Sequence, residues 1–178
     1  MTGRLLAAAA GVLLPLAFAP FHAWYLAPVL LAALFWTWHD QTPREAAIRG
    51  GLFGFAAFAA GTYWLYISIH IIGDAPVWLA IMLMLSLVSL MAAYIGLCGW
   101  LCVRLGGPLW VRWCAVWPAL WTLVEWLRGW LFSGFPWLSL GYGQIDGPLR
   151  GWAPVLGVYG VSLFSAMLAG VVLTLWKV

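Results

Sequence analysis

The sequence predicts an all-α membrane protein, a polytopic transmembrane helix bundle of about six helices. Hydrophobic residues make up 66% of the 178-residue chain and charged residues only 7%, whereas soluble domains average about 45–50% and 25%. Eight Lys and Arg with five Asp and Glu are too few to cover a soluble surface of this size. The apolar runs are separated by short polar or Gly/Pro breaks, as in a chain that crosses a bilayer repeatedly.

The first two predicted helices, 4–19 and 23–38, form a hairpin. Arg4 followed by an apolar run and Ala17-Phe18-Ala19 is also the pattern of a signal peptide. Pro20 makes a poor scissile bond, and the apolar run resumes after a short Pro-Phe-His break. We therefore favour an uncleaved hairpin, although the sequence leaves the retention of residues 1–19 open.

The third predicted helix, 44–69, begins after Thr42-Pro43, a pair typical of an N-cap and a first helical residue. Small residues then recur at helical spacing on one face, which allows a neighbouring helix to approach closely in lipid. These residues are Gly50, Gly54, Ala57 and Gly61.

Three more helices complete a single predicted transmembrane domain, 1–178. The fourth, 77–103, follows a Gly-Asp-Ala-Pro turn and ends at the Gly-Gly-Pro break of 106–108. The fifth and sixth are expected at 110–132 and 152–176, joined by an outer interfacial loop, 133–151.

Basic residues predict the orientation of the bundle. With the N-terminus in the cytoplasm, six basic residues lie inside and only Arg128 and Arg150 lie near the outer side, in agreement with the positive-inside rule. The inner six are Arg4, Arg44, Arg49, Arg104, Arg112 and Lys177. Because they are scattered singly, they do not form a nucleic-acid-binding patch, and no nucleic-acid partner is expected.

Candidate binding residues lie at the end of the fifth helix. Glu125 and Arg128 are one turn apart, and ionisable groups at membrane depth tend to face the bundle interior and to pair. One interpretation is a structural ion pair that fixes the helix to the following loop. The other is direct contact of either residue with a lipid headgroup, and the two are compatible.

The loop 133–151 is too rich in Gly and Pro for a helix and too apolar for a solvated loop. Non-helical backbone persists at membrane depth only when it is buried in protein or lines a cavity. We therefore expect this loop to form a wall of a lipid-accessible cleft.

No catalytic, metal or cofactor site is predicted. The three histidines fall in different loops, and no phosphate-binding Gly-rich loop or nucleophile elbow is present. Cys98 and Cys102 are one helical turn apart but have neither a base to activate a thiolate nor further metal ligands nearby. With Cys114 they are expected to be packing residues.

Four segments together resemble a known family. They are PALWTLVEWLRGW (118–130), GFPWLSLGYGQIDGPLRGWAPVLGVYGVSLF (134–164), LAFAPFHAW (16–24) and GTYWLYISIHIIG (61–73), and they resemble bacterial apolipoprotein N-acyltransferase. The resemblance implies transfer of an acyl chain from a membrane phospholipid, the donor, to the N-terminal diacylglyceryl-cysteine of a lipoprotein, the acceptor. It also implies a multi-pass protein of the bacterial inner membrane.

The resemblance further implies eight transmembrane helices and a nitrilase-like catalytic domain with a Glu-Lys-Cys triad. This sequence contains neither that domain nor the triad, so the chain alone is expected to be inactive, as a truncated transferase. Trp137 and Tyr142, above the pair Glu125 and Arg128, match the membrane side of the family's active site and are expected to shape a substrate-binding cleft; interfacial anchoring alone is the alternative for each of these residues. The alternative is a stand-alone lipid-binding or transport-like membrane protein.

Overall fold

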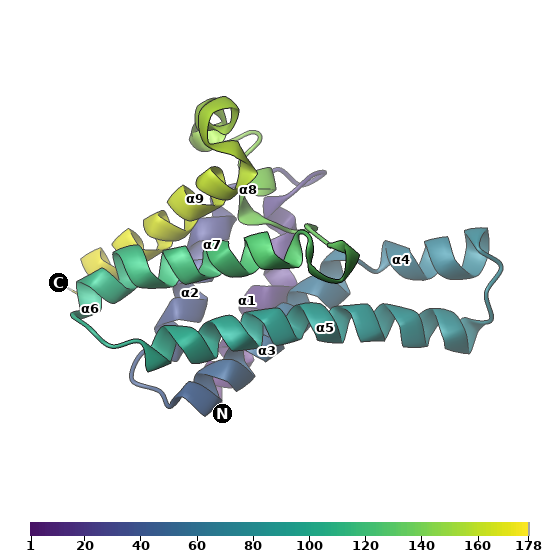
Figure 1. Ribbon diagram of the computed structural model, residues 1–178, viewed down its shortest axis with the longest axis horizontal. Helices are drawn as coiled ribbons and strands as arrows, with labels where there is room; N and C mark the ends of the chain where they lie inside the picture. Colours follow the sequence, from purple (N-terminus) through teal and green to yellow (C-terminus); the bar gives the residue numbers. More distant parts are fainter. Residues whose placement is uncertain (178) are drawn as a thin grey trace.

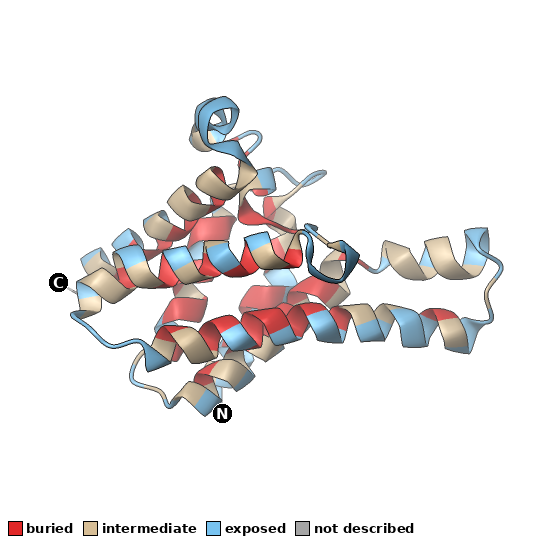
Figure 2. Ribbon diagram, in the orientation of Figure 1, coloured by how far each residue is buried: buried red, intermediate tan, exposed pale blue. Residues whose placement is uncertain are grey.

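The computed structural model describes residues 1–177, and this part of the chain is helical with no strand, so the all-α class is confirmed. The elements in chain order are α1 (Thr2–Leu13), η1 (Leu14–Ala17), α2 (Leu26–Trp38), α3 (Pro43–Gly61), α4 (Trp64–Tyr66), η2 (Ile67–Ile72), α5 (Val77–Arg104), α6 (Leu109–Val111), η3 (Arg112–Val116), α7 (Trp117–Arg128), η4 (Leu131–Ser133), α8 (Leu140–Gly143), η5 (Pro148–Trp152) and α9 (Ala153–Lys177). The buried residues gather where α1, α2, α3, α5, α7 and α9 meet (Figure 2).

Fewer helices among the described residues qualify as candidate membrane spans than the sequence predicts. Among the described residues, α5 and the helical stretch Pro148–Trp176, which includes a break at Gly157, are long and apolar enough to cross a membrane. A third span is added if α3 and the following Trp64–Ile72 helix are taken as one bent span. The helices Thr2–Ala17 and Leu26–Trp38 are apolar but short. The expectation of about six spans is therefore not confirmed.

Helices α3 and α5 form the largest helix contact of the bundle. A Cβ atom added to Gly50 would lie 2.6 Å from the carbonyl oxygen of Ile95, and one added to Gly54 would lie 3.0 Å from Cα of Ala92. The two backbones approach this closely only because glycine has no side chain. The packing predicted for this small-residue face is confirmed at these two positions.

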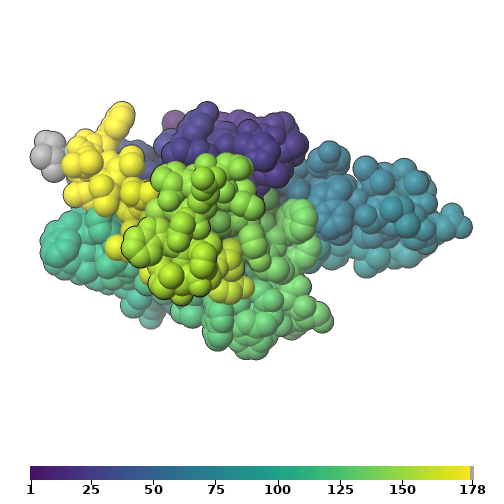
Figure 3. Space-filling model, turned by 90° about the horizontal axis from the view of Figure 1, so that it is seen from above, coloured from purple at the N-terminus to yellow at the C-terminus, as the bar shows by residue number. Residues whose placement is uncertain are grey.

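Helix α3 ends sooner than the sequence predicts. Its last residue is Gly61, and the helix that follows, Trp64–Ile72, is bent by 52° relative to it. That second helix and the first half of α5 extend away from the bundle, and we call residues 63–87 the arm (Figures 1 and 3). Most of the arm is exposed (Figure 2), including Ile71, Ile72 and Trp78.

The fifth predicted helix is divided into α6, a π-helical turn η3 and α7. Pro118, at the start of α7, has no N–H to donate to the preceding turn, and a π-helical turn is a common way to accommodate such a break. Trp117 beside it is fully buried, and its indole N–H donates to the carbonyl oxygen of Cys102 at 2.7 Å. This bond ties α7 to α5.

Helix α9 contains a break at Gly157, whose φ is +64° and ψ is −178°. Only glycine adopts this conformation without strain. The preceding residues, 148–156, therefore form a separate helical segment, seen nearly end-on above the rest of α9 in Figure 1.

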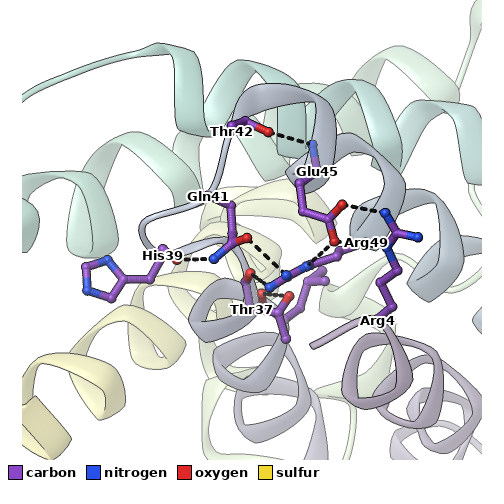
Figure 4. A network of polar contacts seen from close by, with 8 residues as sticks. Arg4, Thr37, His39, Gln41, Thr42, Glu45 and Arg49 are labelled. Carbon is purple, nitrogen blue, oxygen red and sulfur yellow. Dashed lines mark hydrogen bonds and ion pairs between the residues drawn. The ribbon is translucent and has the colours of Figure 1, made fainter. Parts of the chain in front are cut away.

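A polar network joins α1, α2 and α3 near the N-terminus (Figure 4). The carboxylate of Glu45 accepts hydrogen bonds from Arg4, at 2.7 and 3.0 Å, and from Arg49, at 2.9 Å. Arg49 also donates to the carbonyl oxygen of Thr37 at the end of α2. The hydroxyl of Thr42 accepts from the backbone N–H of Glu45, so the predicted N-cap is present.

Candidate functional site at the 133–151 loop

Glu125 and Arg128 lie on the last turns of α7 and are 0% and 1% exposed. Their closest charged atoms, Oε1 of Glu125 and Nη2 of Arg128, are 3.9 Å apart. Oε1 of Glu125 also accepts hydrogen bonds from the indole N–H of Trp121 and from the backbone N–H of Leu140, both at 2.9 Å. The carboxylate therefore connects α7 to the start of α8.

The guanidinium group of Arg128 binds the loop backbone. It donates to the carbonyl oxygens of Phe135, at 3.0 Å, and of Trp137, at 2.6 Å, and to the hydroxyl of Ser139 at 3.2 Å. The ring of Phe58, on α3, lies beneath the same group with its centroid 5.2 Å away. A buried cation whose donors are used by carbonyl oxygens fixes the path of the chain around it. This is the structural ion pair of the first interpretation.

The loop backbone is held in an uncommon conformation. Three residues other than glycine, Phe132, Ser133 and Leu138, have φ values of 54°, 73° and 58°. Such residues persist only where their surroundings define their conformation strongly. Here Gly134 permits the turn, because a Cβ atom at this position would lie 2.1 Å from the carbonyl oxygen of Gly129.

Trp137 lies at the junction between the loop and the arm. Its indole N–H donates to the carbonyl oxygen of Gly61 at 3.3 Å, and its ring packs against Trp64 at an interplanar angle of 57° with centroids 5.2 Å apart. Gly61 is the last residue of α3, and helix ends leave carbonyl groups without helical partners. Trp137 thus satisfies the backbone at the bend while 47% of its surface stays exposed.

Tyr142 lies in a different place, on a groove between α8 and the start of α9. The groove has a volume of about 210 Å³ and is lined by Gly141, Tyr142, Gln144, Ile145, Arg150, Ala153, Val158 and Val161. Tyr142 is 53% exposed. Of the four predicted site residues, only Tyr142 lines this groove.

The predicted residues therefore do not share one cavity. Glu125 and Arg128 are buried beneath the loop, Trp137 contacts the bend of α3, and Tyr142 lines the groove. Direct contact of Arg128 with a headgroup requires the loop to move away from the guanidinium group. Trp137 and Tyr142, in contrast, are each already about half exposed.

Contacts between distant segments were not foreseen from the sequence. Asp146 pairs with His22 in the turn between η1 and α2, and the side-chain amide of Gln144 donates to the carbonyl oxygen of Trp24 at 3.1 Å. These partners are 124 and 120 residues apart in the chain. No local pattern signals such pairs, because they depend on how the helices pack.

Within the described residues, no group of His, Cys, Asp and Glu is arranged to hold a metal ion. Cys98 and Cys102 are fully buried with their sulfur atoms 3.9 Å apart, and Cys114 lies 3.5 Å from the hydroxyl of Thr174. Cys98 and Cys102 therefore lie inside the bundle, and Cys114 is half-buried.

Residues 10–171 match the family model of the apolipoprotein N-acyltransferase N-terminal domain. The chain belongs to this family. Curated relatives named apolipoprotein N-acyltransferase include those of Methylococcus capsulatus, 47% identical over 177 residues, Photobacterium profundum, 41% over 182 residues, and Azotobacter vinelandii, 42% over 183 residues. The alignments cover 97–99% of this chain.

The same alignments cover only 34–35% of each relative. The chain therefore spans about a third of the length of the apolipoprotein N-acyltransferases that it matches. The 133–151 loop and both of its anchors, Glu125 and Arg128, lie inside the matched region.

Proposed function

We propose that this chain is the membrane domain of an apolipoprotein N-acyltransferase. In this role it presents a phospholipid, the acyl donor, and a diacylglyceryl lipoprotein, the acceptor, to catalytic groups outside residues 1–178. The proposal rests on the family match over residues 10–171. It is supported by the apolar helices, whose length and composition suit a membrane, the environment in which both amphiphilic substrates would lie.

The exposed aromatic residues of the loop are proposed to contact the substrates. Trp137 and Tyr142 each expose about half of their surface, and such rings suit the boundary between headgroups and acyl chains. Glu125 and Arg128 contribute differently, by holding the loop backbone that carries both rings. They are positioning residues in this proposal.

Catalysis is proposed to need residues beyond this chain. Transfer through a covalent intermediate requires an activated nucleophile next to a base. Within the described residues, the hydrogen-bonding contacts of the three thiol groups are with each other, for Cys98 and Cys102, and with the hydroxyl of Thr174, for Cys114, and none is with a base. The 178 residues alone are therefore expected to be inactive.

The proposed location is the bacterial inner membrane, with the N-terminus in the cytoplasm. The polar network of Arg4, Glu45 and Arg49 would then lie on the cytoplasmic side. The 133–151 loop would lie on the opposite side, facing the lipoprotein substrate.

A transport-like protein is the alternative. Many transporters contain paired broken helices that meet at a central site. The described residues contain one bent pair, α3 with Trp64–Ile72, and its bend contacts Trp137 of the loop. Because this bend packs against the loop, we favour the membrane domain of an acyltransferase over a transporter.

Complementation of a bacterium depleted of its own N-acyltransferase tests the proposal. The matching N-terminal third of the Methylococcus capsulatus relative would be replaced by residues 1–177 of this chain. We expect the chimera to restore growth and lipoprotein N-acylation, and the 178-residue chain alone to fail. Failure of a chimera that is present in the membrane at normal levels, or rescue by the chain alone, would contradict the proposal.

The same chimera tests the exposed rings. Trp137→Ala and Tyr142→Ala should each reduce acylation at limiting phospholipid, whereas Trp126→Ala should not. Trp126 is a matched control because it is 46% exposed but lies on α7 away from the loop contacts. Equal activity in all three variants would refute a substrate-binding role for the rings.

A further inference from the structure

The turn between η1 and α2 is joined to the 133–151 loop by two side-chain contacts of different kinds. The amide of Gln144 donates to the carbonyl oxygen of Trp24 at 3.1 Å, and the carboxylate of Asp146 pairs with Nδ1 of His22. Gln144 is 2% exposed, whereas the side chains of His22 and Asp146 are 53% and 47% exposed. The amide contact carries no charge, so only the solvent-facing pair responds to pH.

The backbones of the two segments lie close together on both sides of Asp146. A Cβ atom added to Gly143 would lie 3.2 Å from the carbonyl oxygen of Ala17, and one added to Gly147 would lie 3.1 Å from Cδ2 of Trp24. In Figure 1 the turn lies beside α8. The packing of the two segments therefore brings the partners of the pair together.

The 148–156 segment, which follows the pair in the chain, has few attachments of its own. Residues 150–157 are all exposed. Within the described part of the chain, the side chains of the segment make no hydrogen bond or ion pair, and their one ring contact is that of Trp152 with Phe164, at 6.0 Å between centroids. A segment with so few contacts opens more easily than the core of the bundle.

Both ends of this segment are glycines. Gly147 precedes it, and Gly157, whose φ is +64°, follows it at the break in α9. Glycine allows the backbone to turn at both positions with little strain. Asp146 thus makes the last polar side-chain contact before a segment that can pivot.

His22 is the one side chain at this junction of a type that titrates between about pH 5 and 8. Residues 14–26 and 139–161 contain four further titratable or charged groups, and within the described residues none makes a hydrogen bond or ion pair with His22 or Asp146. They are Tyr25 in the turn, Tyr142 on α8, Arg150 on η5 and Tyr159 on α9. The charged residues of α7, Glu125 and Arg128, contact residues 135–140 instead.

We propose that the pair of His22 and Asp146 is a pH-dependent latch for the 148–156 segment. Between the ordinary pKa of a carboxyl group, about 4, and that of an imidazole, about 6.5, both partners are charged and attract each other. Asp146, and with it the start of the segment, is then held against the turn. At higher pH the imidazole is neutral, the attraction between opposite charges is lost, and the segment leaves its position more often.

The latch controls one wall of the groove described above. Arg150 and Ala153 belong to the 148–156 segment and line the groove together with Tyr142, so release of the latch widens it. In the proposed orientation the pair lies on the outer side of the membrane and responds to the pH there. This inference depends on the charges and positions of the pair and not on acyl transfer.

Electron paramagnetic resonance of a nitroxide label at Gly151→Cys tests the latch. A Cβ atom at Gly151 has no neighbour within 4 Å, so the label reports the motion of the segment without disturbing its packing. The chain, with Cys114→Ser and in lipid nanodiscs, would be measured at about pH 5.5 and about pH 8.5, on either side of the titration of histidine. An exposed ion pair changes an equilibrium by about two- to fivefold, and we expect the ratio of mobile to immobile label to rise by this factor at the higher pH.

Matched variants make the result specific to the pair. Asp146→Asn removes the carboxylate, and His22→Asn removes the imidazole but keeps a residue type that tolerates the positive φ of this position. Both should abolish the rise. His70→Gln, at a histidine of the arm, should retain it. A label at Gly106→Cys, which is equally open but lies beyond the end of α5, should show no change with pH.

A ratio that is independent of pH in the chain with His22 and Asp146 intact would overturn the proposal, and this measurement requires no variant of the pair to fold. A rise that persists in Asp146→Asn or His22→Asn, or that disappears in His70→Gln, would also overturn it. An equal rise at Gly106→Cys would show that pH loosens the whole chain and would contradict a local latch. A pair with a structural role alone would lower the melting temperature when either partner is replaced but would leave the ratio independent of pH.

Discussion

At the residue scale, the buried pair of Glu125 and Arg128 organises the 133–151 loop. Four groups from that loop, two carbonyl oxygens, one hydroxyl and one backbone N–H, are bonded to these two side chains. Buried charges are costly unless they are paired and hydrogen-bonded. The loop and the pair therefore depend on each other.

Glu125→Ala should destabilise the protein by about 3–5 kcal/mol, because it leaves the cation of Arg128 buried without its counter-charge. The N–H groups of Trp121 and Leu140 lose their acceptor as well. Thermal unfolding in detergent micelles measures the effect. Leu123→Ala is the control, since Leu123 is 46% exposed on the same helix, and equal losses in the two variants would contradict this role.

Trp137→Phe should loosen the bend between α3 and the arm. It removes the hydrogen bond to the carbonyl oxygen of Gly61 but keeps an aromatic ring against Trp64. A bond worth about 1 kcal/mol predicts roughly fivefold faster amide hydrogen exchange over residues 62–72. Trp130→Phe, at a tryptophan that is 54% exposed and makes no such bond within the described residues, should leave the exchange unchanged.

Sequence reasoning at this scale found the pair but not its partners. Spacing and the cost of buried charge were sufficient to predict that Glu125 and Arg128 face inward. Which backbone groups they bind depends on the positive φ values of Phe132, Ser133 and Leu138. Composition does not encode those values, since none of the three is a glycine.

At the element scale, glycine positions determine how closely helices pack. Gly50 and Gly51 are adjacent on α3 but differ in their surroundings. A Cβ atom at Gly50 would meet the carbonyl oxygen of Ile95 at 2.6 Å, whereas one at Gly51 has its nearest neighbour at 4.0 Å. Alanine substitutions at these two positions therefore distinguish the effect of helix packing on stability from the effect of intrinsic helix propensity.

Gly50→Ala should therefore destabilise the bundle by about 1–3 kcal/mol, since the α3 and α5 backbones must separate. Gly51→Ala should be neutral or stabilising by up to about 1 kcal/mol, because alanine favours helix over glycine. Urea unfolding of both variants in micelles gives the comparison. A larger loss in Gly51→Ala than in Gly50→Ala would show that this contact is not as described.

The breaks in the helices were the least predictable feature of the elements. Apolar runs specify where a helix can lie, but a bend needs only one altered peptide group and leaves the run intact. The 52° bend after Gly61 and the break at Gly157 both lie inside continuous apolar stretches. Pro118 was a visible signal for the third irregularity, the π-helical turn η3.

At the scale of the whole molecule, the sequence predicts an orientation in the membrane that experiment can test. Gly106 and Gly151 are useful positions for testing it, because a Cβ atom at either has no neighbour within 4 Å. With a cytoplasmic N-terminus, Gly106 lies inside and Gly151 outside.

Cysteine labelling in intact cells measures this orientation. In a Cys114→Ser background, a membrane-impermeant maleimide should label Gly151→Cys in intact cells and Gly106→Cys only after lysis. The remaining Cys98 and Cys102 are fully buried and should stay unlabelled. The reverse pattern would establish the opposite orientation.

The unequal lengths of the helices have a consequence for the surrounding bilayer. The 28 residues of α5 extend about 42 Å, whereas the 13 residues of α2 extend about 20 Å. A hydrocarbon core of about 30 Å is shorter than α5, so this helix must tilt or the bilayer must thicken beside it, whereas α2 is short and mostly buried in the bundle. The protein should therefore perturb its lipid annulus mainly on the flank of α5.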